Sequence, residues 1–353
     1  MALASVRPGQ LKLLLAEVIA ARLPTLIVGA PGIGKSDIVR QAADAAGADT
    51  IISHPALADP TDAKGLPWPG KDGTHATFLP FGELASALAA KKPTVWFLDD
   101  LGQATTAVQS GYMQLLLARR VNSHVLPDCV SFVAATNRRG DKAGVTGILE
   151  PVKSRFKTIV ELAPSLQDFC SWALANNIDP RVIAFLRLRR ELLHQFEPSA
   201  KTDMENFPCP RTWQAVSDLL TKTRIEQHPS LLYPAVAGAV GEGAASEFVG
   251  FLKTFKDVPS PDAILLNPET AKIPTEPSAL YAVSSALAHR ANAGNFERIM
   301  KYLARLKDGG QAEFAVMTIR DAQQKTPDIQ DTPAFIAAMS GEFGTLISGG
   351  NVQ

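Results

Sequence analysis

Residues 29–36 read Gly29-Ala30-Pro31-Gly32-Ile33-Gly34-Lys35-Ser36, which is a complete G-x-x-x-x-G-K-[ST] phosphate-binding loop. In such a loop the glycines let backbone N–H groups turn towards the α- and β-phosphates. The lysine, here Lys35, reaches the β- and γ-phosphate oxygens, and the hydroxyl of Ser36 binds Mg²⁺. These eight residues therefore predict a site for a nucleoside triphosphate and its magnesium ion.

The residues on either side of the loop support this interpretation. Thr25–Val28 is a β-branched, apolar run that predicts a buried strand leading into the loop. Residues 36–46 predict a helix that ends at Gly47, and the N-terminus of that helix would point its positive dipole at the phosphates. A glycine-rich turn with a chance lysine would explain neither neighbour.

The composition is that of a globular protein with no strong overall charge. Of 353 residues, 46% are hydrophobic, and 35 basic residues balance 35 acidic ones. This balance gives no global field that favours nucleic acid or a membrane surface. The three cysteines lack C-x-x-C spacing and predict free thiols in a reducing compartment. The longest uncharged stretch is too polar to span a bilayer, so we expect a cytoplasmic protein.

The chain changes character at Pro164. Before it, strand-like and helix-like segments alternate, which is typical of an α/β fold with a parallel sheet. We expect strands at residues 25–28, 50–52, 94–98, 130–135 and 157–162. Leu57–Phe81 is rich in proline and glycine and is predicted to be an insertion outside the core. After Pro164 we expect helices only, interrupted at Pro259–Pro277 by a linker that holds five prolines.

Two adjacent carboxylates follow one of the predicted strands. Val95–Leu98 is apolar and leads directly into Asp99 and Asp100. If this strand is buried beside the strand that precedes the phosphate loop, Asp99 lies next to Ser36 and can hold the magnesium shell, while Asp100 can polarise the attacking water. A buried strand that ends in a solvated turn explains the apolar run, but it does not explain the doubled acid.

Three further polar residues are candidates for contact with phosphate. Asn137 directly follows a predicted strand, and the carboxyl ends of parallel strands line the ligand crevice; the alternative is an ordinary turn former. Arg155 follows a predicted helix near the rim of the domain, from which it can reach a neighbouring subunit's phosphates or form a surface salt bridge. Arg211 lies in the first turn of a predicted helix. A lone cation is disfavoured there by the helix dipole, which indicates either an anionic partner or a solvated face.

In order and spacing, these motifs resemble those of an AAA+ ATPase, and specifically the MoxR branch that groups with magnesium-chelatase ATPase subunits. The resemblance runs from Gln10 to about Leu220. The matches are Gly29–Ser36 with Walker A, Val95–Asp100 with Walker B, Asn137 with sensor 1, Ser154-Arg155-Phe156 with the arginine-finger helix, and Pro210-Arg211 with sensor 2. Gly65–Leu84, which includes Trp68, resembles the helix-2 insert that faces the pore, and Arg119–Val130 resembles the pre-sensor-1 hairpin.

The resemblance implies a fold, ligands and partners. The expected fold is a P-loop NTPase (AAA+) parallel-sheet core at residues 1–163, an all-helical lid domain at 164–227 that carries sensor 2, and a helical C-terminal extension at 228–353. The expected cofactors are ATP and Mg²⁺, and the expected assembly is a homo-oligomer, a hexameric ring with ATP at the subunit interfaces. The implied role is ATP-driven remodelling of a protein client. Members of this branch often work with a partner that bears a von Willebrand factor A domain, so such a partner is expected here.

One position departs from the family pattern. The family usually places Glu after the Walker B Asp, and this chain has Asp100, which is one methylene shorter. A displacement of about 1 Å at a reacting group can cost roughly 10²-fold in rate. The sequence therefore leaves three functions open: a remodelling ATPase, a nucleic-acid motor or loader, and a slowly hydrolysing scaffold gated by nucleotide. Lack of a Lys/Arg run and the neutral charge argue against the nucleic-acid motor.

Overall fold

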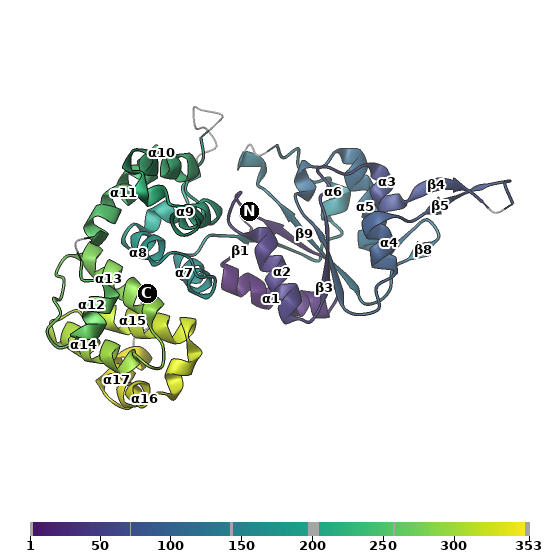
Figure 1. Cartoon of the computed structure of the whole chain (residues 1–353). Coiled ribbons are helices and arrows are strands. Elements are labelled where there is room, and N and C mark those ends of the chain that lie inside the picture. The colour runs from purple at the N-terminus through teal and green to yellow at the C-terminus, as the bar shows by residue number, and fades with distance from the viewer. Residues whose placement is uncertain (1–2, 71, 142–143, 197–204, 257, 350–353) are drawn as a thin grey trace. The chain divides into compact units, whose positions relative to one another are not determined.

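The computed structural model describes residues 3–70, 72–141, 144–196, 205–256 and 258–349. Within these ranges the contacts divide the chain into two units, one within residues 1–165 and 196–201 and the other within 166–195 and 202–353. Figure 1 shows the elements of both. The first unit holds the parallel sheet, and the second is helical in its described residues.

The first unit is built on a six-stranded sheet in which every neighbouring pair is parallel. Its strands are β1 (Ser5–Val6), β2 (Thr25–Val28), β3 (Asp49–Ser53), β6 (Thr94–Leu98), β9 (Val130–Thr136) and β10 (Thr158–Leu162). Their order across the sheet is β1-β10-β2-β9-β6-β3. This α/β architecture confirms the predicted fold class, and it adds the edge strand β1, which sequence analysis missed because two residues give no periodic signal.

Helices cover both faces of the sheet because side chains alternate along each strand. On one face α1 (Pro8–Ala20) and α2 (Lys35–Ala45) pack on Ile27, Phe97 and Ala135, all buried. On the other face the cover is α4 (Gly82–Leu88), α5 (Thr106–Ala118) and α6 (Glu150–Lys153). There the central strands contribute the buried residues that alternate in sequence with those of the first face, among them Leu26, Trp96, Leu98, Phe132 and Ala134. Central strands buried on both sides read as continuous apolar runs, as observed here.

The predicted insertion forms a short helix and a hairpin. Its first part forms the short helix α3 (Pro60–Lys64), whose Ala63 is buried, so this part belongs to the core and the prediction was wrong there. Its second part is an antiparallel hairpin of β4 (Leu66–Pro69) and β5 (Ala76–Leu79). A second hairpin, β7 (Arg120–Val121) and β8 (His124–Val125), lies beside it, since His124 Nε2 is 2.8 Å from the carbonyl oxygen of Phe78.

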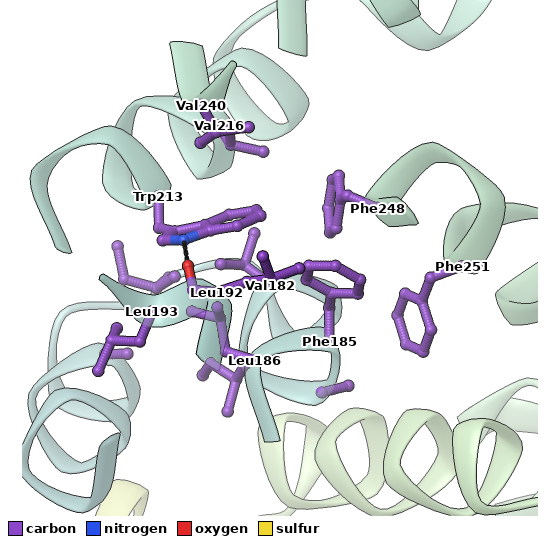
Figure 2. Packing of buried hydrophobic residues seen from close by; sticks show 14 of the residues in the cluster. Val182, Phe185, Leu186, Leu192, Leu193, Trp213, Val216, Val240, Phe248 and Phe251 are labelled. Carbon is purple, nitrogen blue, oxygen red and sulfur yellow. Dashed lines mark hydrogen bonds between the residues drawn. The ribbon is translucent and has the colours of Figure 1, made fainter. Parts of the chain in front are cut away.

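The second unit begins with helices that share one hydrophobic core. They are α7 (Leu166–Ala175), α8 (Pro180–Leu188), α9 (Pro210–Lys222), α10 (Pro229–Val240) and α11 (Glu242–Lys256), with a 3-10 turn at Arg190–Leu193. Figure 2 shows the centre of this core, where Trp213 packs beside Phe185 and Phe248. The indole Nε1–H of Trp213 donates to the carbonyl oxygen of Leu192 at 2.7 Å, which satisfies the one polar atom of a fully buried side chain.

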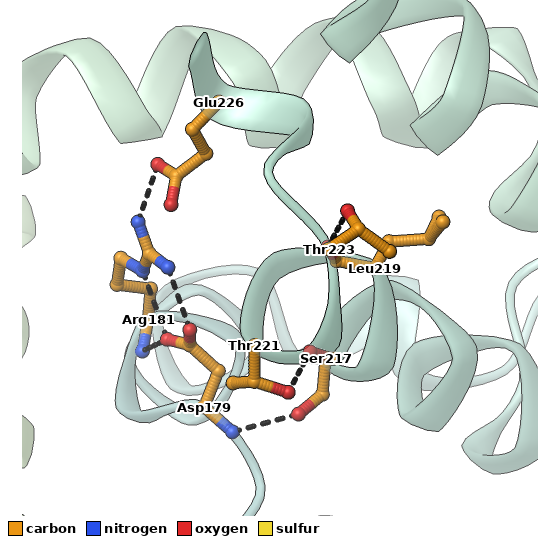
Figure 3. Close-up of polar contacts among 7 residues, drawn as sticks. All are labelled: Asp179, Arg181, Ser217, Leu219, Thr221, Thr223 and Glu226. Atoms are coloured by element: carbon orange, nitrogen blue, oxygen red, sulfur yellow. Dashed lines mark hydrogen bonds and ion pairs between the residues drawn. The ribbon is translucent and has the colours of Figure 1, made fainter.

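A polar network joins the start of α8 to α9 and to the 3-10 turn η4 (Ile225–Gln227) (Figure 3). Arg181 donates to both carboxylate oxygens of Asp179 and to Glu226, and the backbone N–H of Asp179 donates to Ser217 Oγ at 2.8 Å. Burial alone would lower the pKa of Arg181, but its hydrogen bonds with Asp179 and Glu226 outweigh burial and raise the pKa. The buried carboxylate of Asp179 is thus paired with a permanent cation.

The C-terminal helices form a second core within the same unit. They are α12 (Pro261–Leu266), α13 (Pro277–Arg290), α14 (Phe296–Asp308), α15 (Ala312–Lys325), α16 (Pro333–Ser340) and α17 (Glu342–Gly349), with a 3-10 turn at Pro327–Asp331. The predicted linker at Pro259–Pro277 was wrong over α12, whose Ile264 is fully buried. Pro261 and Pro277 occupy the first turns of α12 and α13, where a missing N–H costs nothing.

Helix α13 connects the two cores. Its Ala282 packs in the core of α7–α11, and its Leu280 and Leu287 pack in the C-terminal core. A buried ion pair adds to this connection, because Arg187 of α8 donates through both terminal nitrogens to the carboxylate of Asp321 on α15. The boundaries expected after residues 163 and 227 stay predictions; helices α10 and α11, which follow the second boundary, share a core with α7–α9.

Candidate nucleotide-binding site

The phosphate loop joins β2 to α2, as its flanking residues predict. It is fixed at its start by a hydrogen bond from the N–H of Gly29 to the carbonyl oxygen of Thr136 on β9, at 3.1 Å. Gly34 caps α2 with a φ of 88°, a left-handed conformation that glycine adopts without steric cost. The N–H groups of the first turn of α2 therefore lie directly after the loop, in the arrangement that binds phosphate.

Lys35 is buried, and oxygens surround its ammonium group. Only 7% of the residue is exposed. Its Nζ donates to the carbonyl oxygens of Gly29 and Ala30, each at 2.9 Å, and to Oδ1 of Asn137 at 2.7 Å. An ammonium group has donors only, so the amide oxygen of Asn137 must face it and the amide nitrogen must face away. The structure thus brings Asn137 to the phosphate loop, as predicted from its place after β9.

Ser36 and Asp99 lie in direct contact. Ser36 Oγ donates to Asp99 Oδ2 at 2.6 Å, and the other carboxylate oxygen of Asp99 accepts the N–H of Asp100 at 3.1 Å. The predicted route to this contact was wrong, because β9 lies between β2 and β6, so the two strands are not neighbours. The contact forms nevertheless, since all three strands end at the same edge of the parallel sheet. A hydroxyl and a carboxylate are oxygen ligands of the kind that Mg²⁺ prefers.

Asp100 has an unusual backbone. Its φ is 55° and its ψ is 35°, in the left-handed region, and the 3-10 turn η1 (Leu101–Gln103) follows it. A non-glycine residue in this region costs of order 1–3 kcal/mol, and such residues cluster at functional sites. Asp is among the residues that tolerate the region best, because its short side chain bonds locally. This conformation gives a physical reason for Asp where the family pattern has Glu. Oδ1 of Asp100 lies 3.4 Å from the amide nitrogen of Asn137.

The strand that carries the two acids is anchored from behind. Trp96 of β6 donates its indole N–H to Ser53 Oγ on β3 at 2.8 Å. Tyr112 of α5 packs edge-on against Trp96, and burial raises the pKa of Tyr112 to about 12. These contacts hold the end of β6 in a fixed position.

Among the described residues of the first unit, Arg155 lies outside this group of contacts. Arg155 follows α6 and is half-buried; its Nη1 donates to Ser154 Oγ at 2.7 Å. In the part of the chain that the structure describes, Arg155 pairs with no carboxylate, and its Nε, shielded from solvent, has no acceptor. A salt bridge is therefore not what holds it. Arg211 lies in the second unit, exposed in the first turn of α9.

Sequence analysis missed Gln109. This residue lies on the buried side of α5 with none of its surface exposed, and it hydrogen-bonds to both the start of α5 and the loop that precedes α6. The sequence gives no signal for this role, because Ser110 and Gln114 are equally polar residues of the same helix.

Comparisons with known proteins give remote structural likenesses only. No family model matches the chain, and no curated protein matches it. Among solved structures, the RuvB Holliday junction branch migration motor of Thermotoga maritima is 12% identical with a TM-score of 0.34; the match covers 98% of this chain and 95% of RuvB. NtrX from Brucella abortus in complex with ADP is 16% identical with a TM-score of 0.40, over 93% of this chain and 65% of NtrX.

The fold and the site together define the class. At such TM-scores the likeness adds little, so the assignment depends on the phosphate loop after β2, the strand order and the acids at the end of β6. The chain has the fold of an AAA+ P-loop ATPase. No helix within the described residues is both long and apolar enough to cross a membrane.

We expect Lys35→Ala to weaken ATP binding by about tenfold or more. A charge-assisted hydrogen bond is worth about 1.5–3 kcal/mol, and about 1.4 kcal/mol corresponds to a factor of ten. Titration calorimetry measures the change. The control is Lys92→Ala, which removes an exposed lysine paired with Asp49 at 2.8 Å and should leave affinity unaltered. Unchanged affinity in Lys35→Ala would contradict the assignment of the loop.

We expect Asp100→Asn to retain ATP binding and to lose turnover by about 10²- to 10⁴-fold, the usual contribution of a positioned general base. Asp100→Glu should remain active, because it keeps the carboxylate. Both are measured as steady-state phosphate release at saturating ATP, with Asp128→Asn, a change at a side chain that is 94% exposed, as the control. Hydrolysis by Asp100→Asn at the wild-type rate would exclude Asp100 as the residue that orients water.

Proposed function

We propose that the chain is a MoxR-like AAA+ ATPase that hydrolyses ATP between the subunits of a ring and uses the energy to remodel or activate a protein client. The observation that carries the proposal is the meeting of five polar side chains at one edge of the sheet. Lys35 contacts Asn137, Ser36 contacts Asp99, and Asn137 approaches Asp100. Three separate segments supply these residues, and this combination of a lysine, a hydroxyl, two carboxylates and an amide supports a role in phosphate transfer.

The roles follow from the contacts. Lys35 would exchange the carbonyl oxygens of its own loop for the β- and γ-phosphate oxygens of ATP. Ser36 and Asp99 would hold Mg²⁺, which neutralises charge on the phosphates when bound. Asp100 would accept a proton from the attacking water, and Asn137 would orient that water or the γ-phosphate. Arg211, matched to sensor 2, would respond to the γ-phosphate; this role rests on the resemblance alone.

Arg155 is proposed to complete the site of a neighbouring subunit. Two features of the chain support this. Its guanidinium keeps donors that no described acceptor satisfies, and α6, which precedes it, packs on the face of the sheet opposite to α2. An arginine supplied in trans is worth about 10³–10⁵ in rate in other phosphate-transfer enzymes. A surface salt bridge contributes only about 0–1 kcal/mol.

The β4–β5 hairpin is proposed to contact the client. All eight residues of its two strands are exposed. A different interpretation of the sequence has Trp68 packed as a hydrophobic plug under its own hairpin. The exposure of Trp68 (59%) and Leu79 (52%) argues against that packing. Apolar side chains gathered on an exposed hairpin are typical of a protein-binding surface.

An ATPase assay tests the proposed function. Turnover is measured for the protein alone, with single- and double-stranded DNA, and with an unfolded model protein or a protein that bears a von Willebrand factor A domain. Stimulation by protein and not by DNA supports the proposal. Stimulation by DNA alone would replace it with a nucleic-acid motor. Turnover that stays negligible under every condition would replace it with a nucleotide-gated scaffold.

We expect Arg155→Ala to fold, to bind ATP, and to lose about 10³-fold or more in kcat, because each subunit then lacks its neighbour's arginine. Co-assembled with Asp100→Asn, it should recover part of the activity, since some interfaces pair an intact Asp100 with an intact Arg155. Lys153→Ala, which breaks an exposed pair with Glu150, is the control on the same helix. Full activity at concentrations where only monomer exists would show that Arg155 does not act in trans.

We expect Trp68→Ala to leave the melting temperature and the basal ATPase rate nearly unchanged, because a side chain exposed to this degree adds little to folding. Binding of an unfolded model protein, measured by fluorescence anisotropy, should weaken. Thr77→Ala, at the cross-strand partner of Trp68, is the matched control. A large fall in melting temperature would instead identify Trp68 as a packing residue.

A further inference from the structure

Gln109 uses its buried amide to join two segments of the first unit. Its Nε2 donates to the carbonyl oxygen of Ala104 at 3.0 Å and to that of Gly147 at 2.9 Å. Its Oε1 accepts the N–H of Leu149 at 3.0 Å. Both donors and one acceptor position are therefore occupied in a side chain with no exposed surface. Buried polar groups with all partners in place fix the geometry of their surroundings.

The two joined segments belong to different parts of the catalytic machinery. Ala104 ends the turn that begins at Asp100. Leu149 is the N-cap of α6, and Arg155 lies two residues after the end of that helix. A second set of bonds runs in parallel, because the carbonyl oxygen of Gly102 accepts the N–H of Thr146 at 3.1 Å and the N–H of Gly147 at 3.3 Å.

Gly102 brings the same turn against β9. A Cβ at this position would lie 2.2 Å from Oγ1 of Thr136, the residue that precedes Asn137. Only glycine permits this approach without a shift of one segment. The turn after Asp100 thus lies against the Thr136 side chain at the end of β9 and is hydrogen-bonded to the loop before α6. Gln109 adds side-chain hydrogen bonds between this turn and the same loop.

Helix α6 needs an external anchor. It has four residues, and a single helical turn is not stable by itself. Val152 and Phe156 bury their side chains in the core, which fixes the far end of this segment. Its near end is held by Gln109 through Leu149 and Gly147. The N–H of Arg155 then donates to the carbonyl oxygen of Val152 at 3.0 Å, so the place of Arg155 follows from the place of α6.

We propose that Gln109 is a positioning residue that sets where Arg155 is presented to the neighbouring subunit. The inference rests on the proposed function, in which Arg155 completes a neighbour's site. Gln109 itself has no exposed surface. It acts through α6, and it connects the turn after Asp100 in one site to the arginine offered to the next. A defect at Gln109 would therefore appear in the neighbour's site and not in its own.

Mixing experiments with Gln109→Leu test this inference. The variant keeps the volume and removes the three hydrogen bonds. We expect ATP affinity within about twofold of wild type and kcat at least tenfold lower. Co-assembled with Asp100→Asn, it should regain activity, because its intact Asp100 meets a correctly placed Arg155. Co-assembled with Arg155→Ala, it should not. The control is Gln114→Leu, at an exposed residue of the same helix.

The other outcomes overturn the inference. Rescue by Arg155→Ala but not by Asp100→Asn would mean that Gln109 serves Asp100 of its own subunit. If Gln109→Leu has the wild-type kcat while Arg155→Ala is inactive, the positioning role of Gln109 is wrong and the proposed function stands. If Arg155→Ala is itself active, the proposed ring mechanism is wrong. If Gln109→Leu does not assemble, Gln109→Met takes its place in both mixtures. It keeps the unbranched shape of the side chain and removes the same three hydrogen bonds, so the same pattern is expected.

Discussion

Lys35 is buried, with 7% of the residue exposed, and its ammonium group donates hydrogen bonds to three oxygen atoms. A buried ammonium group without such partners would lose its proton or unfold its surroundings. Two of the partners are carbonyl groups of the loop itself, and the third is Asn137 at the end of β9. The loop and β9 must therefore meet, and the bond from the N–H of Gly29 to Thr136 brings them together.

The parallel sheet satisfies this constraint with little extra structure. Because all strands run the same way, the ends of β2, β9 and β6 lie at one edge in that order. Asn137, on the middle strand, then stands between Lys35 and Asp100 and contacts both. In the proposed function, ATP would draw Lys35 towards its phosphates, and Asn137 would lose the hydrogen bond from Lys35 that it accepts at 2.7 Å. The residue that holds the lysine would then also respond to the nucleotide.

The parts predictable from sequence were those in which local chemistry dictates local geometry. The loop from Gly29 to Ser36 encodes its own backbone path, and an apolar run followed by Asp99 encodes a strand end. Proline was less informative, because it marks a linker and the first turn of a helix equally well. Pro261 and Pro277 open helices whose buried faces meet partners far along the chain. Strand order was likewise out of reach, since nothing in β2 or β6 specifies that β9 lies between them.

Gln109 shows why the remaining part of the site could not be predicted. Its partners Gly147 and Leu149 lie 38 and 40 residues away, and no spacing rule joins a glutamine on a helix to a distant loop. In the sequence it resembles Gln114, which is exposed on the same helix. Only the fold distinguishes them: one amide faces water, and the other fixes the helix that leads to Arg155. Motifs located the residues that we propose to bind ATP. In the proposed ring, long-range hydrogen bonds of this kind would couple the site of one subunit to the arginine that it supplies to the next.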